Sequence, residues 1–264
     1  MGLREVLEKL VKGEISVEEA MREIKLYGVE EIESMVRFDV GRELRRGIPE
    51  IVFAEHKSPD VLDEIIKRIL SRSGRVIVSR LCSEHYSVVE KYRNGYQVEV
   101  NTRGRVAVIR ARGVRKEYTG GIVGVVTAGT SDIPLAEEAR TIVEEMGCKA
   151  IAIYDVGIAS FKRVLDAVKK LVEENVDVAI VIAGMEGALP SVIASFIDVP
   201  VIGVPASRGY GLGGGGVSAL LSMLQSCTLG VLTVNIDNSV GAAVAAAMIA
   251  RRIGFYRSMA KAKE

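Results

Sequence analysis

Five apolar runs, separated by stretches of similar length, dominate the sequence from Gly121 onward. Each run is apolar at every position rather than at alternate positions, as expected for strands covered by helices on both faces. The stretches between the runs are long enough for the crossover helices that parallel strands require. The runs cover residues 122–126, 150–154, 178–183, 199–204 and 230–234. This pattern predicts an α/β fold: a parallel, doubly wound, Rossmann-like or flavodoxin-like domain of three layers.

The sequence before Gly120 has a different character, with charged residues crowded at 42–46 and 103–116. Ser16 and Glu19 have the spacing of a capping box, and Ser58 followed by Pro59 is a second helix start. Further elements are predicted at 75–79 (strand), 83–92 (helix), and 97–101 and 106–109 (hairpin). We therefore expect a small N-terminal domain, helical plus α+β, at 1–116 and a larger domain at 117–264.

Charge and apolar patterning exclude several classes of protein. The 264 residues contain 35 Lys and Arg against 34 Asp and Glu, so no basic excess points to nucleic acid or an anionic membrane. Polar residues interrupt the longest apolar stretch, 227–250, so we expect no membrane span. The N-terminus lacks the apolar core of a signal peptide, and three cysteines without framework spacing suit a reducing compartment. A cytoplasmic protein without disulfides is expected.

Small and polar residues follow the first expected strand, where parallel sheets bind their ligands. Gly129, Thr130 and Ser131 precede a helix that begins near Pro134, and together they suit a phosphate or carboxylate cradle. Asp132 would repel a phosphate, which favours binding of a hydroxyl or metal, or proton transfer. Ser131 or Asp132 acting simply as a helix cap is the alternative interpretation.

A lone acid, Glu186, follows the third strand between small residues. Confinement there suits a general acid or base, whereas a helix-start acid facing the dipole is the alternative. After the fourth and fifth strands we expect further substrate-binding residues, namely Ser207, Gly211, Gly213, Gly214, Asn235 and Asp237. The run 211–216 formally fits GxGxxG but follows the wrong strand for a dinucleotide fingerprint, so we interpret it as a flexible loop closing over substrate.

Cys227 shares a predicted helix face with Leu220, Met223 and Leu224, which indicates an inert core thiol. His56 and His85, the only histidines, lie in the N-terminal part. The larger domain therefore has no imidazole for a Ser-His-Asp catalytic triad or a Cys-His dyad. The cluster at 82–85 (CSEH) has no further Cys or His nearby, which disfavours zinc. A GxxxxGK[ST] phosphate loop is also missing.

Several of these segments resemble a known group of enzymes. The runs 128–134 (AGTSDIP), 183–190 (AGMEGALP), 199–205 (VPVIGVP) and 211–235 look like the aminoimidazole ribonucleotide carboxylase, or PurE-type, domain. Details at 184–190, 221–227 (LSMLQSC) and 234–238 (VNIDN) resemble its LarB branch, which builds the nickel-pincer nucleotide cofactor. The runs 38–42 and 47–50 extend that resemblance over nearly the whole chain.

The LarB resemblance implies carboxylation of the pyridinium ring of nicotinic acid adenine dinucleotide and hydrolysis of its phosphoanhydride. The products would be pyridinium-3,5-biscarboxylic acid mononucleotide and AMP. It further implies that Cys227 is a thiolate nucleophile and that Glu186 and Asp132 are the acids that move the ring proton. Carbon dioxide or bicarbonate is the implied co-substrate; Mg²⁺ could assist the anhydride cleavage, with no ligands assigned, and no tightly bound organic cofactor is expected.

Two alternative functions stay open. A purine-type carboxylase or mutase is disfavoured because the family places a histidine where this chain has Ala188. A non-catalytic nucleotide-binding protein would use the same strand-end pocket and would not need Cys227. The resemblance also implies a homo-oligomer, with an octamer as one candidate, and the helix carrying Val240, Val244, Met248 and Ile249 is a candidate subunit surface.

Overall fold

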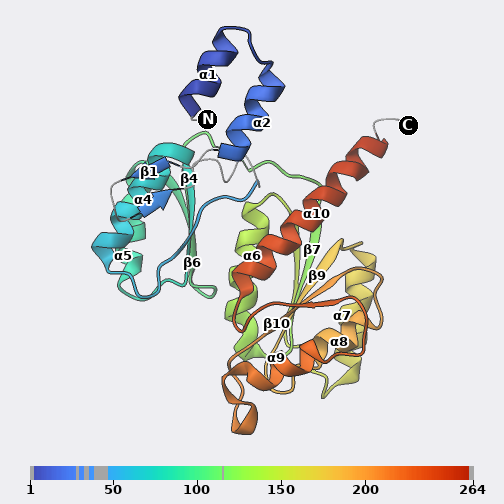
Figure 1. Cartoon of the computed structure of the whole chain (residues 1–264). Helices are drawn as coiled ribbons and strands as arrows, with labels where there is room; N and C mark the ends of the chain where they lie inside the picture. The colour runs from blue at the N-terminus through green and yellow to red at the C-terminus, as the bar shows by residue number, and fades with distance from the viewer. Residues whose placement is uncertain (1–2, 28–29, 33–35, 39–46, 115, 262–264) are drawn as a thin grey trace.

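The computed structural model describes residues 3–27, 30–32, 36–38, 47–114 and 116–261. The larger, C-terminal unit is built on five parallel strands in the order β11-β10-β9-β7-β8 (Figure 1). The strands are β7 (Ile122–Thr127), β8 (Lys149–Ile153), β9 (Val178–Ala183), β10 (Val201–Pro205) and β11 (Val231–Thr233). Every residue of β9 and β10 is buried, because helices cover both faces of the sheet. The predicted doubly wound parallel sheet is confirmed.

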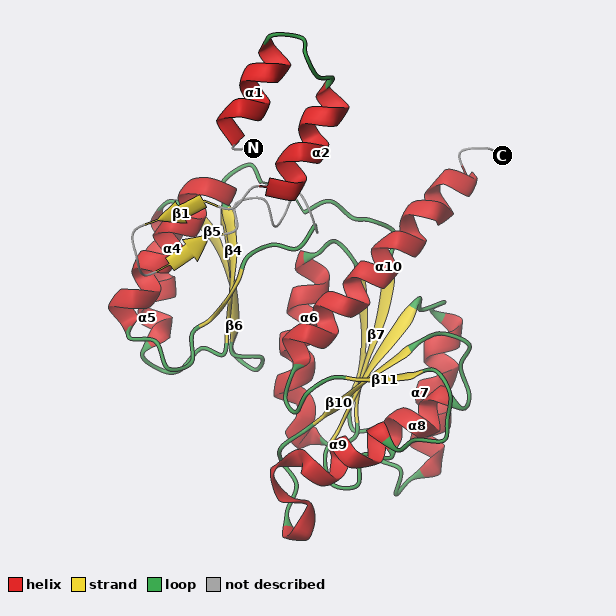
Figure 2. Cartoon of the chain, viewed as in Figure 1, coloured by secondary structure: helices red, strands yellow, loops and turns green. Residues whose placement is uncertain are grey.

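Helices pack on both faces of this sheet (Figure 2). One face carries α6 (Ile133–Glu145) and α10 (Ser239–Lys261), and the other carries α7 (Phe161–Glu173), α8 (Leu189–Ala194) and α9 (Val217–Leu224). The alanines of α10 at positions 242, 243, 246, 247 and 250 are fully buried, so this helix lies close against the sheet and α6. Short 3₁₀ segments, η2 (Thr130–Asp132) and η3 (Gly211–Gly216), follow β7 and β10.

The N-terminal unit has a four-stranded mixed sheet in the order β3-β4-β6-β5. Its elements are β3 (Ile51–Phe53), α4 (Pro59–Ser73), β4 (Arg75–Ser79), α5 (His85–Glu90), η1 (Lys91–Asn94), β5 (Tyr96–Asn101) and β6 (Val106–Ala111). Before them lie α1 (Leu3–Val11), α2 (Val17–Tyr27) and the short pair β1 (Glu30–Ile32) and β2 (Val36–Phe38). The predicted α+β class is confirmed, although β3 was not predicted because it has only three residues.

Both helix starts proposed from the N-terminal sequence are present. Ser16 and Glu19 exchange the two hydrogen bonds of a capping box, at 2.8 and 3.1 Å. Ser58 accepts a hydrogen bond from the amide of Val61, with Pro59 in the first turn of α4. Part of the LarB-like run at 38–42 lies outside the described residues, as do residues 43–46.

The N-terminal sheet packs on α6, so this helix lies between two sheets. Ile77, Val106 and Val108 belong to the same buried cluster as Ala139 and Ile142 of α6. On its other face the N-terminal sheet has a separate core with α4 and α5. The sequence placed a boundary between two domains, and the structure adds that apolar side chains from both domains form one continuous cluster.

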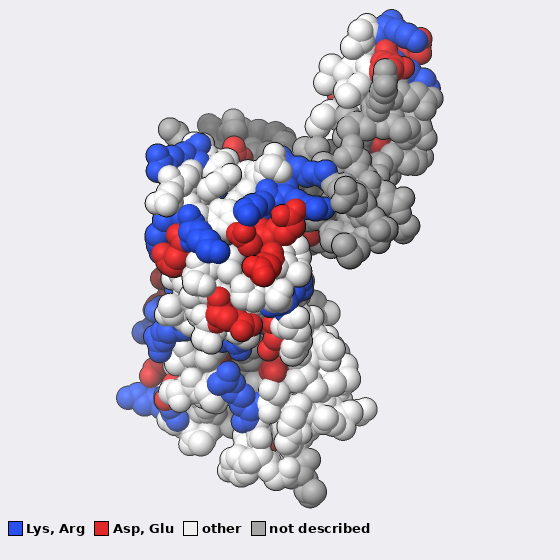
Figure 3. All heavy atoms as spheres, turned by 90° about the vertical axis from the view of Figure 1, so that its left-hand side faces the viewer, with Lys and Arg blue, Asp and Glu red and all other residues white. Residues whose placement is uncertain are grey.

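Charged side chains on the outer face of the N-terminal unit are mixed in sign. Figure 3 shows Lys and Arg interspersed with Asp and Glu there rather than gathered into one basic area. Within the described residues, no helix is long and apolar enough to cross a membrane. Cys82, Cys148 and Cys227 are all free thiols.

Candidate functional site

A pocket opens at the carboxyl ends of the parallel strands, where the order of connection changes direction. β7 leads through α6 to β8 on one side, whereas the chain then crosses to β9 on the other side of β7. In doubly wound sheets a crevice forms at this switch point. The pocket has a volume of about 240 Å³. Its lining comes from four segments that follow β7, β8, β9 and β10: residues Ala128, Gly129, Ser131, Asp132, Gly157, Ile158, Ala159, Ala183, Gly184, Met185, Glu186, Ala188, Leu189 and Arg208.

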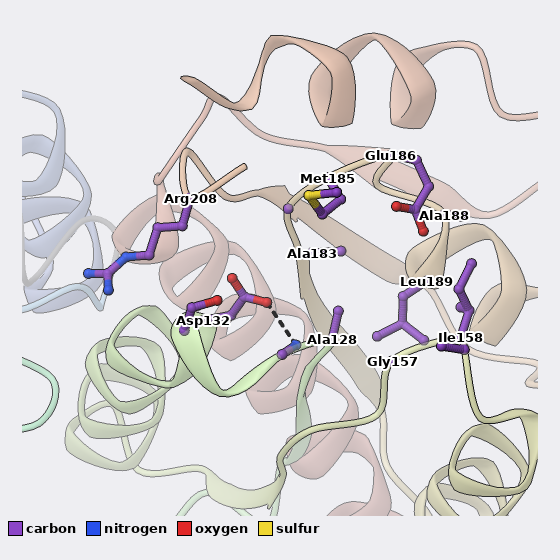
Figure 4. Close-up of a pocket in the computed structure, with 14 residues that line it drawn as sticks. Ala128, Asp132, Gly157, Ile158, Ala183, Met185, Glu186, Ala188, Leu189 and Arg208 are labelled. Carbon is purple, nitrogen blue, oxygen red and sulfur yellow. Dashed lines mark hydrogen bonds between the residues drawn. The ribbon is translucent and has the colours of Figure 1, made fainter. Parts of the chain in front are cut away.

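Asp132 is the buried acid of the pocket, with only 3% of its surface exposed. Its Oδ2 accepts a hydrogen bond from the Gly129 amide at 2.9 Å, which fixes the turn after β7 (Figure 4). Burial raises the pKa of Asp132, the Gly129 amide and the Arg208 charge oppose that rise, and the Asp237 charge adds to it. Asp132 is therefore a stronger base than an ordinary carboxylate and is held in one orientation.

Glu186 lies across the pocket from Asp132 (Figure 4). It belongs to the turn between β9 and α8, in which Met185 has φ 50° and Gly187 has φ 66°. Two left-handed residues reverse the chain within this turn and leave the Glu186 side chain exposed at the pocket. α8 begins at Leu189, so Glu186 lies before the first turn of that helix and not within it.

The loop after β10 is tied to the turn after β11. The Asp237 carboxylate accepts a hydrogen bond from the Ser207 amide at 2.8 Å, and the Asp237 amide donates to the Pro205 carbonyl at 2.9 Å. Arg208 follows directly and lines the pocket on the Asp132 side (Figure 4). Ser207 and Asp237 lie outside the pocket lining, and their hydrogen bonds hold the loop that carries Arg208.

Not all of the sequence-predicted site residues line the pocket. The structure brings together Gly129, Ser131, Asp132 and Glu186. The glycines at 211, 213 and 214 and Thr130 lie outside its lining, on η3 and η2. The side chain of Asn235 accepts from the neighbouring Ile236 amide, and Asn238 caps α10 by accepting from the Gly241 amide.

The structure places Cys227 outside the helix that was predicted to contain it. Its helix, α9, ends at Leu224, and Cys227 lies exposed on the loop before β11, so the interpretation as a buried core thiol is wrong. The helical spacing was extended too far: α9 ends at Leu224, and beyond it the Ser226 hydroxyl lies 2.7 Å from the Ser191 hydroxyl. Cys227 precedes the amino end of β11, whereas the pocket surrounds the carboxyl ends of the neighbouring strands, and it is not part of the lining.

Sequence reasoning missed two parts of the pocket. The segment Gly157, Ile158 and Ala159 follows β8 and has no polar side chain of its own. Arg208 was passed over inside a glycine-rich loop. A signal for both existed, because every strand of a parallel sheet contributes its carboxyl end to the same edge.

Acidic, histidine and cysteine side chains are dispersed over the described residues. No three His, Cys, Asp or Glu side chains converge there as a metal site would need. His85 is buried, its Nδ1 accepts from the Cys82 amide at 3.0 Å, and its Nε2 lies 2.8 Å from the Lys57 carbonyl. Both ring nitrogens of His85 thus have backbone partners.

Comparison with protein families gives two matches that follow one another along the chain. Residues 122–258 match the AIR carboxylase family, and residues 29–111 match the LarB/PurE-like N-terminal domain. The first match contains all four segments of the pocket.

Individual relatives agree with this assignment. An uncharacterized protein of Methanocaldococcus jannaschii is 42% identical over 256 residues, covering 95% of this chain and 97% of that protein. N5-carboxyaminoimidazole ribonucleotide mutases of Pyrococcus horikoshii and of M. jannaschii are 37% and 35% identical, covering 48% and 47% of this chain and 71% and 76% of their own lengths. The chain therefore belongs to the AIR carboxylase family, and its LarB/PurE-like N-terminal domain gives it the domain arrangement of the LarB branch.

Proposed function

We propose that this protein carboxylates the pyridinium ring of nicotinic acid adenine dinucleotide and hydrolyses the phosphoanhydride, giving pyridinium-3,5-biscarboxylic acid mononucleotide and AMP. The observation that carries the proposal is the pocket, which has two carboxylates, Asp132 and Glu186, one arginine, Arg208, and no imidazole. A purine mutase depends on histidine in this domain. The chain has no histidine there, because His56 and His85 both lie in the N-terminal unit.

The proposed chemistry begins with addition of the Cys227 thiolate to the electron-poor ring. This forms a carbon–sulfur bond and makes another ring carbon nucleophilic, which attacks carbon dioxide to form the new carbon–carbon bond. A base then removes the proton from that carbon, and the electron pair restores the aromatic ring and expels the thiolate. The ring exchanges a proton for a carboxylate, and no oxidant or reductant is needed.

Asp132 is our candidate for the base that accepts the ring proton. Its carboxylate is buried, oriented by the Gly129 amide, and has a raised pKa, which matches a group that must take up a proton. Glu186, exposed on the opposite side, is available to orient the ring or the incoming carbon dioxide. Mg²⁺ has no ligand set among the described residues, so we assign it no residue and no step.

The separation of Cys227 from the pocket leads to a proposal about assembly. The thiol is exposed, and so are Leu221, Leu224, Leu229 and Leu232 on the same segment, which leaves apolar surface open around it. We infer that a second copy of the chain packs on this segment of the first. The Cys227 of the second copy would then complete the pocket of the first copy. The active species would then be a homo-oligomer.

The first test is mass spectrometry of the reaction of the purified protein with nicotinic acid adenine dinucleotide, bicarbonate and Mg²⁺. We expect AMP and a mononucleotide that is heavier than nicotinic acid mononucleotide by one carbon dioxide, from the wild type and from the control variant Cys82→Ser. Cys227→Ser should still bind the dinucleotide and make no product. Unchanged dinucleotide from all three proteins would overturn the substrate assignment, and turnover of N5-carboxyaminoimidazole ribonucleotide would then favour the mutase activity named for the relatives.

Complementation tests the second copy. Cys227→Ser and Asp132→Asn should each be inactive alone, because one lacks the thiol and the other lacks the base. After subunit exchange, a pocket with an intact Asp132 can receive Cys227 from its neighbour, so activity should return. Mixed oligomers, verified by native mass spectrometry, that stay inactive would show that both groups must come from one chain.

A further inference from the structure

The N-terminal domain reaches the turn between β11 and α10 at two points. Arg80, directly after β4, donates from its NH2 to the carbonyl oxygen of Asp237 at 2.9 Å. One residue earlier, Ser79 donates to Glu138 of α6 at 2.6 Å, and the other oxygen of Glu138 accepts from Ser239 at the start of α10. Two neighbouring residues of one domain therefore hold two residues of a single turn in the other.

Both contacts involve side chains that are buried or held in place by neighbours. Glu138, Ser79 and Ser239 are at most 3% exposed, so this carboxylate bridges the domains inside the protein. Arg80 is aligned by Glu55, 3.2 Å from its NH1, and by the ring of Phe53, 5.6 Å from its guanidinium carbon. Arg80 and Asp237 have φ angles of 56° and 55°, a sparsely populated conformation for non-glycine residues that persists where the surroundings hold it.

Docking of the two domains does not depend on Arg80. The apolar cluster that includes Ile77, Val106 and α6 joins them, and Arg110 pairs with Glu145 across the same surface. Asn101 also donates to Glu137 at 2.6 Å. Arg80 is 31% exposed and lies outside the pocket lining. Its contacts are therefore not needed to dock the domains and do not involve the ligand directly.

Asp237 connects this contact to the pocket. The Asp237 carboxylate accepts a hydrogen bond from the Ser207 amide, and the Asp237 amide donates to the Pro205 carbonyl. The position of this turn therefore sets the position of the loop that carries Arg208. We propose that Arg80 and Glu138 form a bracket through which the N-terminal domain positions Asp237 and, through it, the 205–208 loop at the pocket. Arg80 is thus a positioning residue, and the part of this inference that concerns turnover depends on the function proposed above.

Hydrogen exchange measured by mass spectrometry tests the bracket without reference to activity. In Arg80→Ala the amides of Ser207 and Asp237 should exchange roughly tenfold faster or more, because a hydrogen bond from a charged donor no longer holds the turn. Glu138→Gln should accelerate the same amides, and Arg80→Lys should restore part of the protection because lysine still donates to a carbonyl. The matched control is Arg68→Ala, which removes an exposed arginine paired with Glu64 on α4.

Kinetics provide the second readout. Arg80→Ala should lower kcat about tenfold or more and leave KM within a factor of about two, because Arg80 does not contact the ligand. Arg80→Lys should recover part of kcat, and Arg68→Ala should match the wild type, with melting temperatures of all variants recorded. If the wild type forms no carboxylated product, the proposed function fails and the exchange result alone decides on the bracket. Exchange at Ser207 and Asp237 that is no faster in Arg80→Ala than in Arg68→Ala would overturn it.

Discussion

Asp132 shows how one residue connects burial with chemistry. Its carboxylate is almost fully covered, accepts one backbone hydrogen bond, and has a pKa raised mainly by burial. An acid whose pKa is higher in the folded state than in the unfolded state stabilises the fold when protonated. That stability is present below the unfolded pKa and is lost as pH rises through the folded pKa. The charged form needed for catalysis is therefore the less stable form.

Asp132→Asn should separate stability from activity. The amide oxygen of asparagine can still accept from the Gly129 amide, but the buried charge is gone. At pH 7 we expect a melting temperature equal to or above that of the wild type. The difference should shrink as pH falls through the raised pKa of the folded state and should be closed below about 4, near the unfolded pKa of aspartate. Carboxylation should fall by roughly 10²-fold or more if Asp132 is the base. Calorimetry across pH, with activity measured on the same samples, checks this, and a variant that is both active and destabilised at pH 7 would contradict it.

Single residues differ in how far the sequence predicts them. Asp132 and Glu186 were identified because a strand end places them at the ligand edge, whatever their side chains contact. Cys227 was misplaced because periodicity alone does not show where a helix ends, and here a serine hydrogen bond between Ser226 and Ser191 forms beyond the last turn. Arg80 could not be identified at all, because its partner Asp237 lies 157 positions away in the chain.

At the scale of elements, the turn between β9 and α8 depends on Gly187. Its φ is 66°, and a Cβ placed there would lie 2.7 Å from the backbone of Ala219 in α9. The turn that presents Glu186 is thus packed directly against the helix that follows β10. Any side chain at position 187 must push α9 away from the pocket edge.

Gly187→Ala should therefore destabilise the protein by more than its backbone conformation alone explains. The matched control is Gly215→Ala, where φ is 71° and nothing lies within 4 Å of the added methyl group. The control should lose about 1–2 kcal/mol from left-handed strain, and Gly187→Ala should lose roughly a further 1–3 kcal/mol from overpacking. Urea unfolding of both variants measures the difference, and equal losses would show that α9 yields without cost.

Element positions followed the sequence closely wherever the strands are buried on both faces. The run predicted at 178–183 is β9, because every side chain in it must be apolar. β11 is shorter than its predicted run, and β3 escaped prediction, since three residues offer no periodicity to detect. The pairing of these strands into two sheets and the packing of one sheet on α6 depend on contacts between distant residues, which local patterns do not contain.

On the scale of the whole molecule, the two domains share a buried ion pair as well as an apolar core. Arg110 of β6 and Glu145 of α6 have side chains 7% and 1% exposed, and Arg75 lies 3.7 Å from the other Glu145 oxygen. Burial raises the pKa of Glu145, and the charges of Arg110, Lys116 and Arg75 oppose that rise. Removal of Arg110 alone would take the nearest cation from the buried Glu145 carboxylate and leave it only Arg75, 3.7 Å away, and the charge of Lys116.

Arg110→Met should lower the free energy of unfolding by about 3–5 kcal/mol, because breaking one side of a buried pair is costly. The loss should shrink as pH falls, since a Glu145 with a still higher pKa becomes neutral by protonation. The double variant Arg110→Met/Glu145→Leu should recover most of the loss, because the buried carboxylate that lost its nearest partner is gone. As a control, Arg163→Met breaks an exposed pair with Asp155 and should cost no more than about 1 kcal/mol.

Because the apolar cluster is continuous across the two domains, wild type and variants should unfold in a single transition by circular dichroism. A second transition would show that the two domains unfold independently. A double variant as unstable as Arg110→Met would show that the loss does not come from the buried Glu145 charge.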